Sequence, residues 1–274
     1  MKTKKPKKTE VHALYDQLFV TESKYKKNNL YPIHKVLAFS ENDICDIYQW
    51  IEKYIGFPET GDILDAGCGV GWGTSFIAQH TEAKVLGISI SPNEIDQAHM
   101  VHQTQKGTSE NQLSFACLSF DEVKDKQYSM IIAVESIKHS PNIQLTLIGL
   151  INALTPDGTL VVVEDTLQAI TCKNQLGALM SDWQLSEVLS QSHMDPNNLT
   201  NAKDSVEYQQ FDFTHLMQNT PTLLTNLKLG IMTVLLMIKP KHMGWQAFRG
   251  GFILDKLYKK KRMKYLAHIY RKIN

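Results

Sequence analysis

The sequence predicts an α/β fold with a doubly wound, mostly parallel sheet, and three observations support this. Residues 62–75 have the pattern of a short apolar strand, a glycine-rich loop and then a helix. Strand and helix patterns alternate from there to Asp165, which favours right-handed crossovers between parallel strands. The strand at 129–134 is apolar on both faces, as is typical of a central parallel strand.

Composition excludes several classes of protein. The 274 residues are enough to bury a core without a metal or a disulfide, and 43% hydrophobic with 21% charged residues is typical of a globular protein in water. The net charge of +1 gives no overall bias toward nucleic acid, and we expect no nucleic-acid partner. Four widely spaced cysteines without a C-x-x-C pair indicate neither a zinc site nor a disulfide framework, so we expect a cytoplasmic protein without a metal. They are Cys45, Cys68, Cys117 and Cys172.

The N-terminal region divides into two parts. Five lysines within residues 1–8 predict a disordered basic tail over residues 1–10. Residues 11–58 are predicted to be mainly helical, with an amphipathic stripe that begins at Ile44 and ends before Pro58. Ser40 and Asp43 resemble a capping box for that helix.

Glycine occupies every second position of the loop after the first strand, at Gly67, Gly69 and Gly71. Glycine permits positive φ and lets a ligand lie directly against the backbone. The dinucleotide spacing G-x-G-x-x-G fails, because Trp72 and Thr74 stand where its last glycine belongs. We therefore expect a cradle for another small molecule, followed by a helix with Thr74 or Ser75 as N-cap.

The string Leu64-Asp65-Ala66-Gly67-Cys68-Gly69-Val70-Gly71 resembles the first motif of class I S-adenosylmethionine-dependent methyltransferases. The resemblance implies a seven-stranded, Rossmann-like sheet with residues 59–165 as the core that binds S-adenosylmethionine. It also implies that Gly67, Cys68, Gly69 and Gly71 wrap the methionine and ribose of the cofactor, while Asp65 places the loop and the amino-acid end. A glycine-rich turn without a ligand is the alternative.

The second strand covers residues 84–88, and the loop that follows it restricts the resemblance to a smaller group of methyltransferases. Many methyltransferases place an acid at the end of this strand to hold the ribose, but this chain has Ser89. The string Gly-Ile-Ser-Ile-Ser-Pro is similar to that of natural-product, sterol and tocopherol methyltransferases and of cyclopropane fatty acid synthases. In that group this loop, here Ser89 and Ile90, and a side chain on the next helix hold the ribose, which implies Glu94. An acid that only interacts with the helix dipole explains Glu94 as well.

The third strand, 113–117, precedes the expected adenine contact. The family usually has an aspartate after this strand that accepts from the adenine amino group, and by position this sequence offers Ser119, with Asp121 two places later. The resemblance then implies that Ser119, its backbone and the Phe120 ring hold adenine.

Polar residues follow the fourth strand, which ends at Val134. Ligands of open α/β sheets lie beyond the carboxyl ends of the strands, so Val134 is expected near the cofactor and Glu135 and His139 near a methyl acceptor. Residues 135–139 resemble the Glu-Ser-x-x-His signature of the same group. If the acceptor carries a proton, a neutral histidine is suited to accept it near pH 7. A histidine that only caps the following turn is the alternative.

The second half of the chain is expected to complete the fold. A fifth strand, 159–163, ends in Glu164 and Asp165, one of which is expected to face the pocket. Residues 166–240 are predicted to form an insertion that roofs the acceptor pocket, together with a sixth strand. Its apolar stretch 229–238 is expected to be a buried helix. Residues 241–274 are predicted to add a helix and an antiparallel last strand.

Two basic features of the C-terminal part allow more than one interpretation. Arg249-Gly250-Gly251 is expected to be a local packing feature rather than an RNA-binding element. A basic cluster near the end of the predicted helix is expected either to contact a membrane surface weakly or to be only a solvated helix end. In the second case the helix dipole favours the cations. Its members are Lys256, Lys259, Lys260, Lys261, Arg262 and Lys264.

The sequence thus predicts an S-adenosylmethionine-dependent methyltransferase that acts at oxygen, nitrogen or carbon of a small, apolar molecule. Glu135 and His139 are the expected catalytic residues, and Tyr31 and His34 are expected in an N-terminal lid. One alternative is methylation or cyclopropanation of a lipid chain at a membrane. A second is a non-catalytic protein that binds the cofactor, with Ser89 and Ser119 marking a decayed site.

Overall fold

A computed structural model describes residues 35, 37–40, 43–103, 112–123, 127–168, 173–199, 205–217 and 221–273, and the structural statements below concern these residues. The predicted basic tail, Tyr31 and His34 lie outside the described residues.

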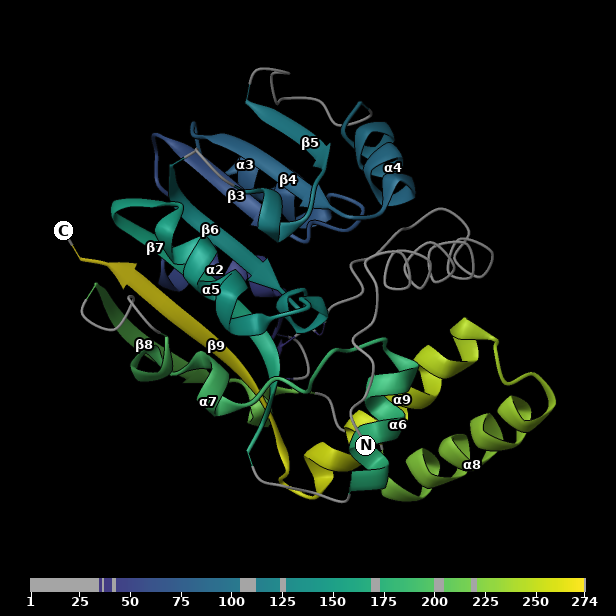
Figure 1. Ribbon diagram of the computed structural model, residues 1–274. Coiled ribbons are helices and arrows are strands. Elements are labelled where there is room, and N and C mark those ends of the chain that lie inside the picture. Colours follow the sequence, from purple (N-terminus) through teal and green to yellow (C-terminus); the bar gives the residue numbers. More distant parts are fainter. Residues whose placement is uncertain are drawn as a thin grey trace.

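A seven-stranded sheet forms the centre of the molecule, in the order β5-β4-β3-β6-β7-β9-β8 (Figure 1). Strands β3 to β7 pair in parallel, and β9 pairs antiparallel with both of its neighbours. This confirms the predicted doubly wound, mostly parallel sheet with an antiparallel last strand. The strands are β3 (Asp62–Ala66), β4 (Lys84–Ser89), β5 (Leu113–Cys117), β6 (Tyr128–Val134), β7 (Leu154–Leu167), β8 (Val206–Asp212) and β9 (Met263–Lys272).

Helices cover both faces of the sheet. The face that carries Ile63 and Val163 packs against α2 (Ile47–Tyr54), α3 (Trp72–Gln79) and α4 (Pro92–Gln103). The opposite face, with Leu64, packs against α5 (Ile143–Asn152) and α7 (Gln191–Met194). Because both faces are covered, the residues of β6 from Met130 to Val134 are all buried, as expected for a central strand. Short 3₁₀ helices are η1 (Phe120–Glu122), η2 (Ile137–His139), η3 (Pro196–Asn198) and η4 (Thr214–Leu216).

Three further helices gather beyond the carboxyl end of β6 (Figure 1). They are α6 (Lys173–Asp182), α8 (Thr222–Ile238) and α9 (Met243–Lys259). Arg249 on α9 donates two hydrogen bonds, of 2.7 and 2.6 Å, to the buried carboxylate of Asp182 on α6. A Cβ added to Gly250 would come within 2.4 Å of the Trp183 indole nitrogen, so the two helices need glycine there. The Arg-Gly-Gly sequence is therefore a packing feature, as predicted.

The N-terminal region differs from the sequence prediction. Residues expected to be helical instead form a two-stranded antiparallel sheet of β1 (Leu37–Ser40) and β2 (Asp43–Cys45). The cap of α2 is Asp46, which accepts a hydrogen bond from the Tyr48 amide at 2.9 Å, while its own amide donates to the Gln49 side chain. The capping box expected at Ser40 and Asp43 was wrong because Ile44, counted in the helical stripe, lies in β2.

Two elements of the second half also differ from expectation. Strand β7 is longer than predicted, because it continues from Leu154 across an irregularity in its pairing with β6 and extends to Leu167, where helix was expected. The apolar stretch 229–238 is helical, as expected, but it is not buried. Met237 is 76% exposed and Ile238 is 71% exposed, whereas Leu236 is buried. In the described part of the chain, none of the helices combines the length and hydropathy required to cross a bilayer.

Candidate active site

The three glycines after β3 form a bend that is packed on its sides and open in its middle. All three have positive φ, +95° at Gly67, +54° at Gly69 and +79° at Gly71. A Cβ added to Gly67 would lie 2.3 Å from Cβ of Ser136, and one on Gly71 would lie 2.7 Å from the Phe115 ring. A Cβ on Gly69 would meet no heavy atom within 4 Å. The bend therefore leaves open space beside its backbone at Gly69.

Asp65 fixes the elements around this bend. Its carboxylate is fully buried and accepts hydrogen bonds from the Tyr48 hydroxyl of α2 at 2.9 Å and the Thr74 hydroxyl of α3 at 2.6 Å. Helix α3 begins at Trp72 with Gly71 as its N-cap, so the N-cap predicted at Thr74 or Ser75 was wrong. The Thr74 hydroxyl is engaged with Asp65 instead, which holds α2 and α3 to the end of β3.

The residues expected near the ribose lie together at the end of β4. Ser89 and Glu94 are both buried, and the Ser89 hydroxyl donates to the Glu94 carboxylate at 2.6 Å. The neighbouring Ile90 carbonyl accepts a long contact from the Cys117 thiol at 3.7 Å. Burial, with Asp65 and Glu94 nearby, raises the pKa of the Cys68 thiol well above its usual value. The Cys68 thiol thus stays neutral and lines the bend, and it does not act as a nucleophile.

The residues expected near adenine follow β5. Ser119 caps η1: its amide donates to the Glu122 carboxylate at 2.7 Å, and its hydroxyl oxygen accepts from the Asp121 amide at 3.4 Å. Phe120 is half-buried against the core on the α5 face.

Glu135 follows β6 in a strained conformation, and its side chain reaches the start of β9. Its φ is +50°, in the left-handed region that favours glycine. Its amide donates to the Val163 carbonyl at 2.8 Å, which keeps the backbone aligned with β7. Its carboxylate accepts from the Tyr265 hydroxyl at 3.0 Å and from the Lys35 amide at 2.9 Å.

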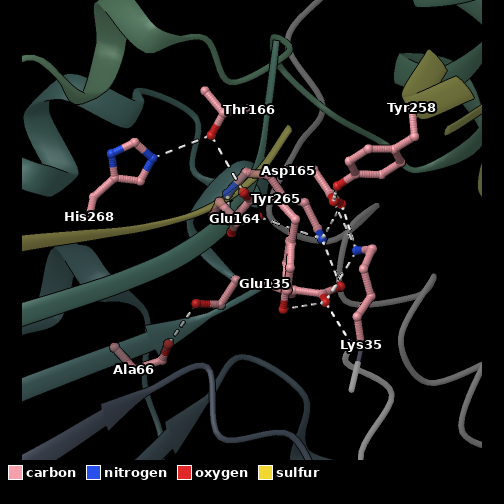
Figure 2. A network of polar contacts seen from close by, with 11 residues as sticks. Lys35, Ala66, Glu135, Glu164, Asp165, Thr166, Tyr258, Tyr265 and His268 are labelled. Carbon is pink, nitrogen blue, oxygen red and sulfur yellow. Dashed lines mark hydrogen bonds and ion pairs between the residues drawn. The ribbon is translucent and has the colours of Figure 1, made fainter. Parts of the chain in front are cut away.

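Glu135 belongs to a group of ionisable side chains at the ends of β6 and β7, which we call the charge cluster (Figure 2). The Lys35 ammonium lies 2.9 Å from Asp165 and 3.2 Å from Glu135. The Lys138 ammonium lies 3.5 Å from Glu135, 3.7 Å from Glu164 and 3.8 Å from Asp165. The members of the charge cluster are Lys35, Glu135, Lys138, Glu164, Asp165, Tyr258 and Tyr265.

Burial controls the proton affinities of the charge cluster. It raises the pKa of Glu164 to about 7, an effect that Lys138 opposes and that Asp165 and Glu135 reinforce. Burial and the carboxylates also raise the pKa of Tyr258 and Tyr265 well above the usual tyrosine value, so both phenols keep their protons. Tyr258 donates its hydrogen bond to Asp165. Two lysines thus balance three acids, one of which carries a pKa close to neutrality.

His139 lies in η2, beside the charge cluster in sequence but with a different electrostatic character. Burial and the adjacent Lys138 lower the pKa of its imidazole to about 3, although Glu135 acts in the opposite direction. The imidazole is therefore neutral at physiological pH, as a general base must be, but its affinity for a proton is low.

Four members of the charge cluster are not predictable from local sequence patterns, namely Lys35, Lys138, Tyr258 and Tyr265. Tyr265 pairs with Asp165 in the β7–β9 register, which only the strand pairing reveals. Both predicted acids after the fifth strand belong to the charge cluster, rather than one of them. Among the described residues, no three His, Cys, Asp or Glu side chains are grouped so that they could hold a metal ion.

Comparisons with known proteins agree with this geometry. Residues 38–219, more than half of the chain, match the methyltransferase domain family. The chain is 28% identical to sterol 24-C-methyltransferase of Neurospora crassa over 117 residues, which are 42% of this chain and 30% of that protein. The chain thus spans less than half the length of that curated relative.

Two solved structures share the fold. The cyclopropane synthase MmaA2 of Mycobacterium tuberculosis has a TM-score of 0.71 at 12% identity, with 98% of this chain and 99% of that chain covered. Geranyl diphosphate C-methyltransferase of Streptomyces coelicolor has a TM-score of 0.70 at 9% identity, with 97% and 98% covered.

The open space beside the backbone of Gly69 fits a small molecule that lies directly against the bend. Because the match covers residues 38–219, the chain belongs to the methyltransferase domain family, with S-adenosylmethionine as its cofactor.

Proposed function

We propose that this protein transfers the methyl group of S-adenosylmethionine to oxygen, nitrogen or carbon of a small, apolar molecule. The observation that carries the proposal is the direct contact between the glycine bend and the end of β6. The Ser136 hydroxyl donates to the Ala66 carbonyl at 2.7 Å, and Gly67 leaves no room for a Cβ beside Ser136. A cofactor in the bend would thus lie next to Glu135, on the same edge of the sheet as the charge cluster.

The bound cofactor supplies an electrophilic methyl group, and the side chains of the protein position the acceptor relative to it. Glu135 and Asp165 hold the Lys35 ammonium between them, and Tyr265 and Tyr258 fix the two carboxylates. Such an ion-paired wall is preorganised, so it can orient an acceptor in line with the methyl group, and orientation supplies most of the rate of such a transfer. In this proposal Glu135 acts as the orienting group of that wall.

His139 is the proposed proton acceptor if the acceptor loses a proton. Its imidazole is neutral at physiological pH, and its pKa of about 3 makes it a weak base in the protein without ligands. A weak base is sufficient for an acceptor that becomes acidic as it attacks the methyl group. His139→Ala should lower turnover while the affinity for S-adenosylmethionine stays nearly unchanged.

The apolar class of acceptor is supported by the relatives. Those named above include enzymes for a sterol and for geranyl diphosphate, both with large apolar parts. The chain also places an indole ring at the charge cluster, with the Lys138 ammonium 5.0 Å from the centre of the Trp183 ring. An aromatic wall beside ion-paired groups suits a molecule with an apolar body and one polar end.

The test is an extract of small molecules from the source cells, incubated with the protein and isotopically labelled S-adenosylmethionine. We expect mass spectrometry to show a labelled small product that forms more slowly with His139→Ala. Cofactor binding is measured in parallel by calorimetry. A Kd for S-adenosylmethionine well above about 1 mM would indicate the non-catalytic alternative. Loss of cofactor binding in His139→Ala would assign the histidine a structural role instead.

A further inference from the structure

Helix α8 presents a row of apolar side chains to solvent, which we call the outer stripe. Its residues recur every three or four positions, so they lie on one face of the helix. Leu223 is 83% exposed, Val234 is 57% exposed and Met237 is 76% exposed. The outer stripe consists of Leu223, Leu227, Ile231, Val234, Met237 and Ile238. In Figure 1, α8 lies on the periphery of the molecule.

The opposite face of α8 already has a partner. Thr225 and Leu236 are buried on that side, and the Thr225 hydroxyl lies 2.5 Å from the Lys259 ammonium of α9. One side of the helix is therefore packed on the protein, and the apolar outer stripe on the other side faces water. A helix of that kind at the surface of a protein indicates a second apolar environment, since contiguous exposed apolar side chains mark interaction sites.

The charges around the outer stripe are almost all positive. Residues 222–262, the hairpin of α8 and α9, contain nine Lys or Arg and a single acid, Asp255. The carboxyl end of α8 is followed by Lys239 and Lys241. The carboxyl end of α9 lies beside the start of α8, as the contact between Lys259 and Thr225 shows, and exposed cations follow it. These are Lys260, Lys261 and Arg262. Cations thus flank the outer stripe at both ends.

We propose that the α8–α9 hairpin docks on an anionic lipid bilayer, with α8 lying in the plane of the interface. The outer stripe would enter the acyl region, and the flanking cations would contact lipid phosphates. The 17 residues of α8 span about 25 Å, less than the hydrocarbon thickness of about 30 Å, so the helix lies on the bilayer rather than across it. Charge favours this occupant over a second copy of the chain, because two copies would bring two strongly positive hairpins together.

The first experiment uses the full chain and flotation with two kinds of vesicle, phosphatidylcholine alone and phosphatidylcholine mixed with phosphatidylglycerol. We expect binding to the mixed vesicles that weakens as salt is raised. Ile231→Glu/Val234→Glu should weaken binding by at least about tenfold, and Lys239→Glu/Lys241→Glu should weaken it and remove part of the salt dependence. The matched controls are Leu145→Glu, at a 64% exposed leucine on α5, and Lys84→Glu, at an exposed lysine of β4, which should bind as the unmodified protein does.

A second measurement needs no variant, so it remains valid if a variant fails to fold. Amide hydrogen exchange of the unmodified chain should slow in residues 222–241 when the mixed vesicles are added, and stay unchanged in α5. Equal vesicle binding by Ile231→Glu/Val234→Glu and the unmodified chain would overturn the proposal. The proposal would also be overturned if the unmodified chain bound neither kind of vesicle but formed a dimer, and if Ile231→Glu/Val234→Glu abolished that dimer. That result would assign the outer stripe to contact with a second copy of the chain.

Discussion

The glycine bend and the charge cluster lie at the same edge of one sheet, but they are built in opposite ways. The bend comes from one continuous stretch, 67–71, and is shaped by backbone conformation and by the lack of Cβ atoms. The charge cluster takes side chains from positions as far apart as Lys35 and Tyr265, and opposite charges hold it together. A site made of backbone tolerates changes of charge but not of shape, and a site made of ion pairs has the reverse sensitivity.

The most damaging change should therefore remove a cation from the charge cluster. Lys138→Met keeps the length of the side chain but leaves Glu135, Glu164 and Asp165 with Lys35 alone. Since Lys138 is almost fully buried, we expect the free energy of unfolding to fall by about 3 to 5 kcal/mol in urea denaturation. Lys84→Met, at an exposed lysine of β4, should change it by less than about 0.5 kcal/mol. Equal effects of the two substitutions would show that the charge cluster does not depend on its buried lysine.

The next largest effect should be on how stability depends on pH. The folded pKa of Glu164 is about 7 and its unfolded pKa is near 4.5, so between these values the folded state holds a proton that the unfolded state has lost. Raising the pH through this window therefore lowers stability, by about 3 kcal/mol in total. Relative to Glu164→Gln, the unmodified protein should lose stability between pH 5 and pH 7.

The difference between these two proteins is the quantity to measure, by urea unfolding at both pH values. His139 and His268 have a pKa lowered to about 3, so their protonation in the unfolded state gives the opposite slope in both proteins. Subtraction removes that slope. A pH-independent difference would mean that Glu164 titrates normally in the folded state.

A smaller loss of stability should follow a change of shape in the bend. Gly67→Ala requires positive φ from alanine and places Cβ against Ser136, which should cost about 2 to 3 kcal/mol. Gly149→Ala in α5 is the control, because its Cβ would meet no heavy atom within 4 Å. That helical substitution should be neutral or stabilise by up to about 1 kcal/mol. Similar melting temperatures for both variants would contradict the tight packing of the bend.

The contrast between the two regions also explains what could be predicted from sequence. The glycine loop and the parallel strands were predictable, because each follows from a local pattern, whereas the joint position of Ser89 and Glu94 was implied only by the family resemblance. Tyr265, Tyr258 and Lys35 were not predictable, since only the pairing of β7 with β9 and the packing of α9 bring them to Asp165. The exposure of α8 was not predicted for a related reason. A run of apolar residues predicts burial, but it does not show whether another part of the same chain covers it.

The smallest effect expected is on the pH profile of methyl transfer. An imidazole with a pKa of about 3 stays neutral from pH 5 upward, so His139 should add no inflection near pH 6.5 to kcat/KM once an acceptor is found. An inflection near pH 6.5 that disappears in His139→Asn would show that the bound acceptor or cofactor returns the pKa of His139 to the usual histidine value.

The open centre of the bend allows the most direct test of the cofactor site. Gly69→Ala fills the space beside the backbone while meeting no protein atom, so the variant should fold with a loss of only about 1 to 2 kcal/mol. Calorimetric titration with S-adenosylmethionine should show one saturable site in the unmodified protein and in Gly149→Ala, and at least about tenfold weaker binding in Gly69→Ala. Unchanged affinity in Gly69→Ala, or no binding by the unmodified protein, would contradict a cofactor seated on the bend.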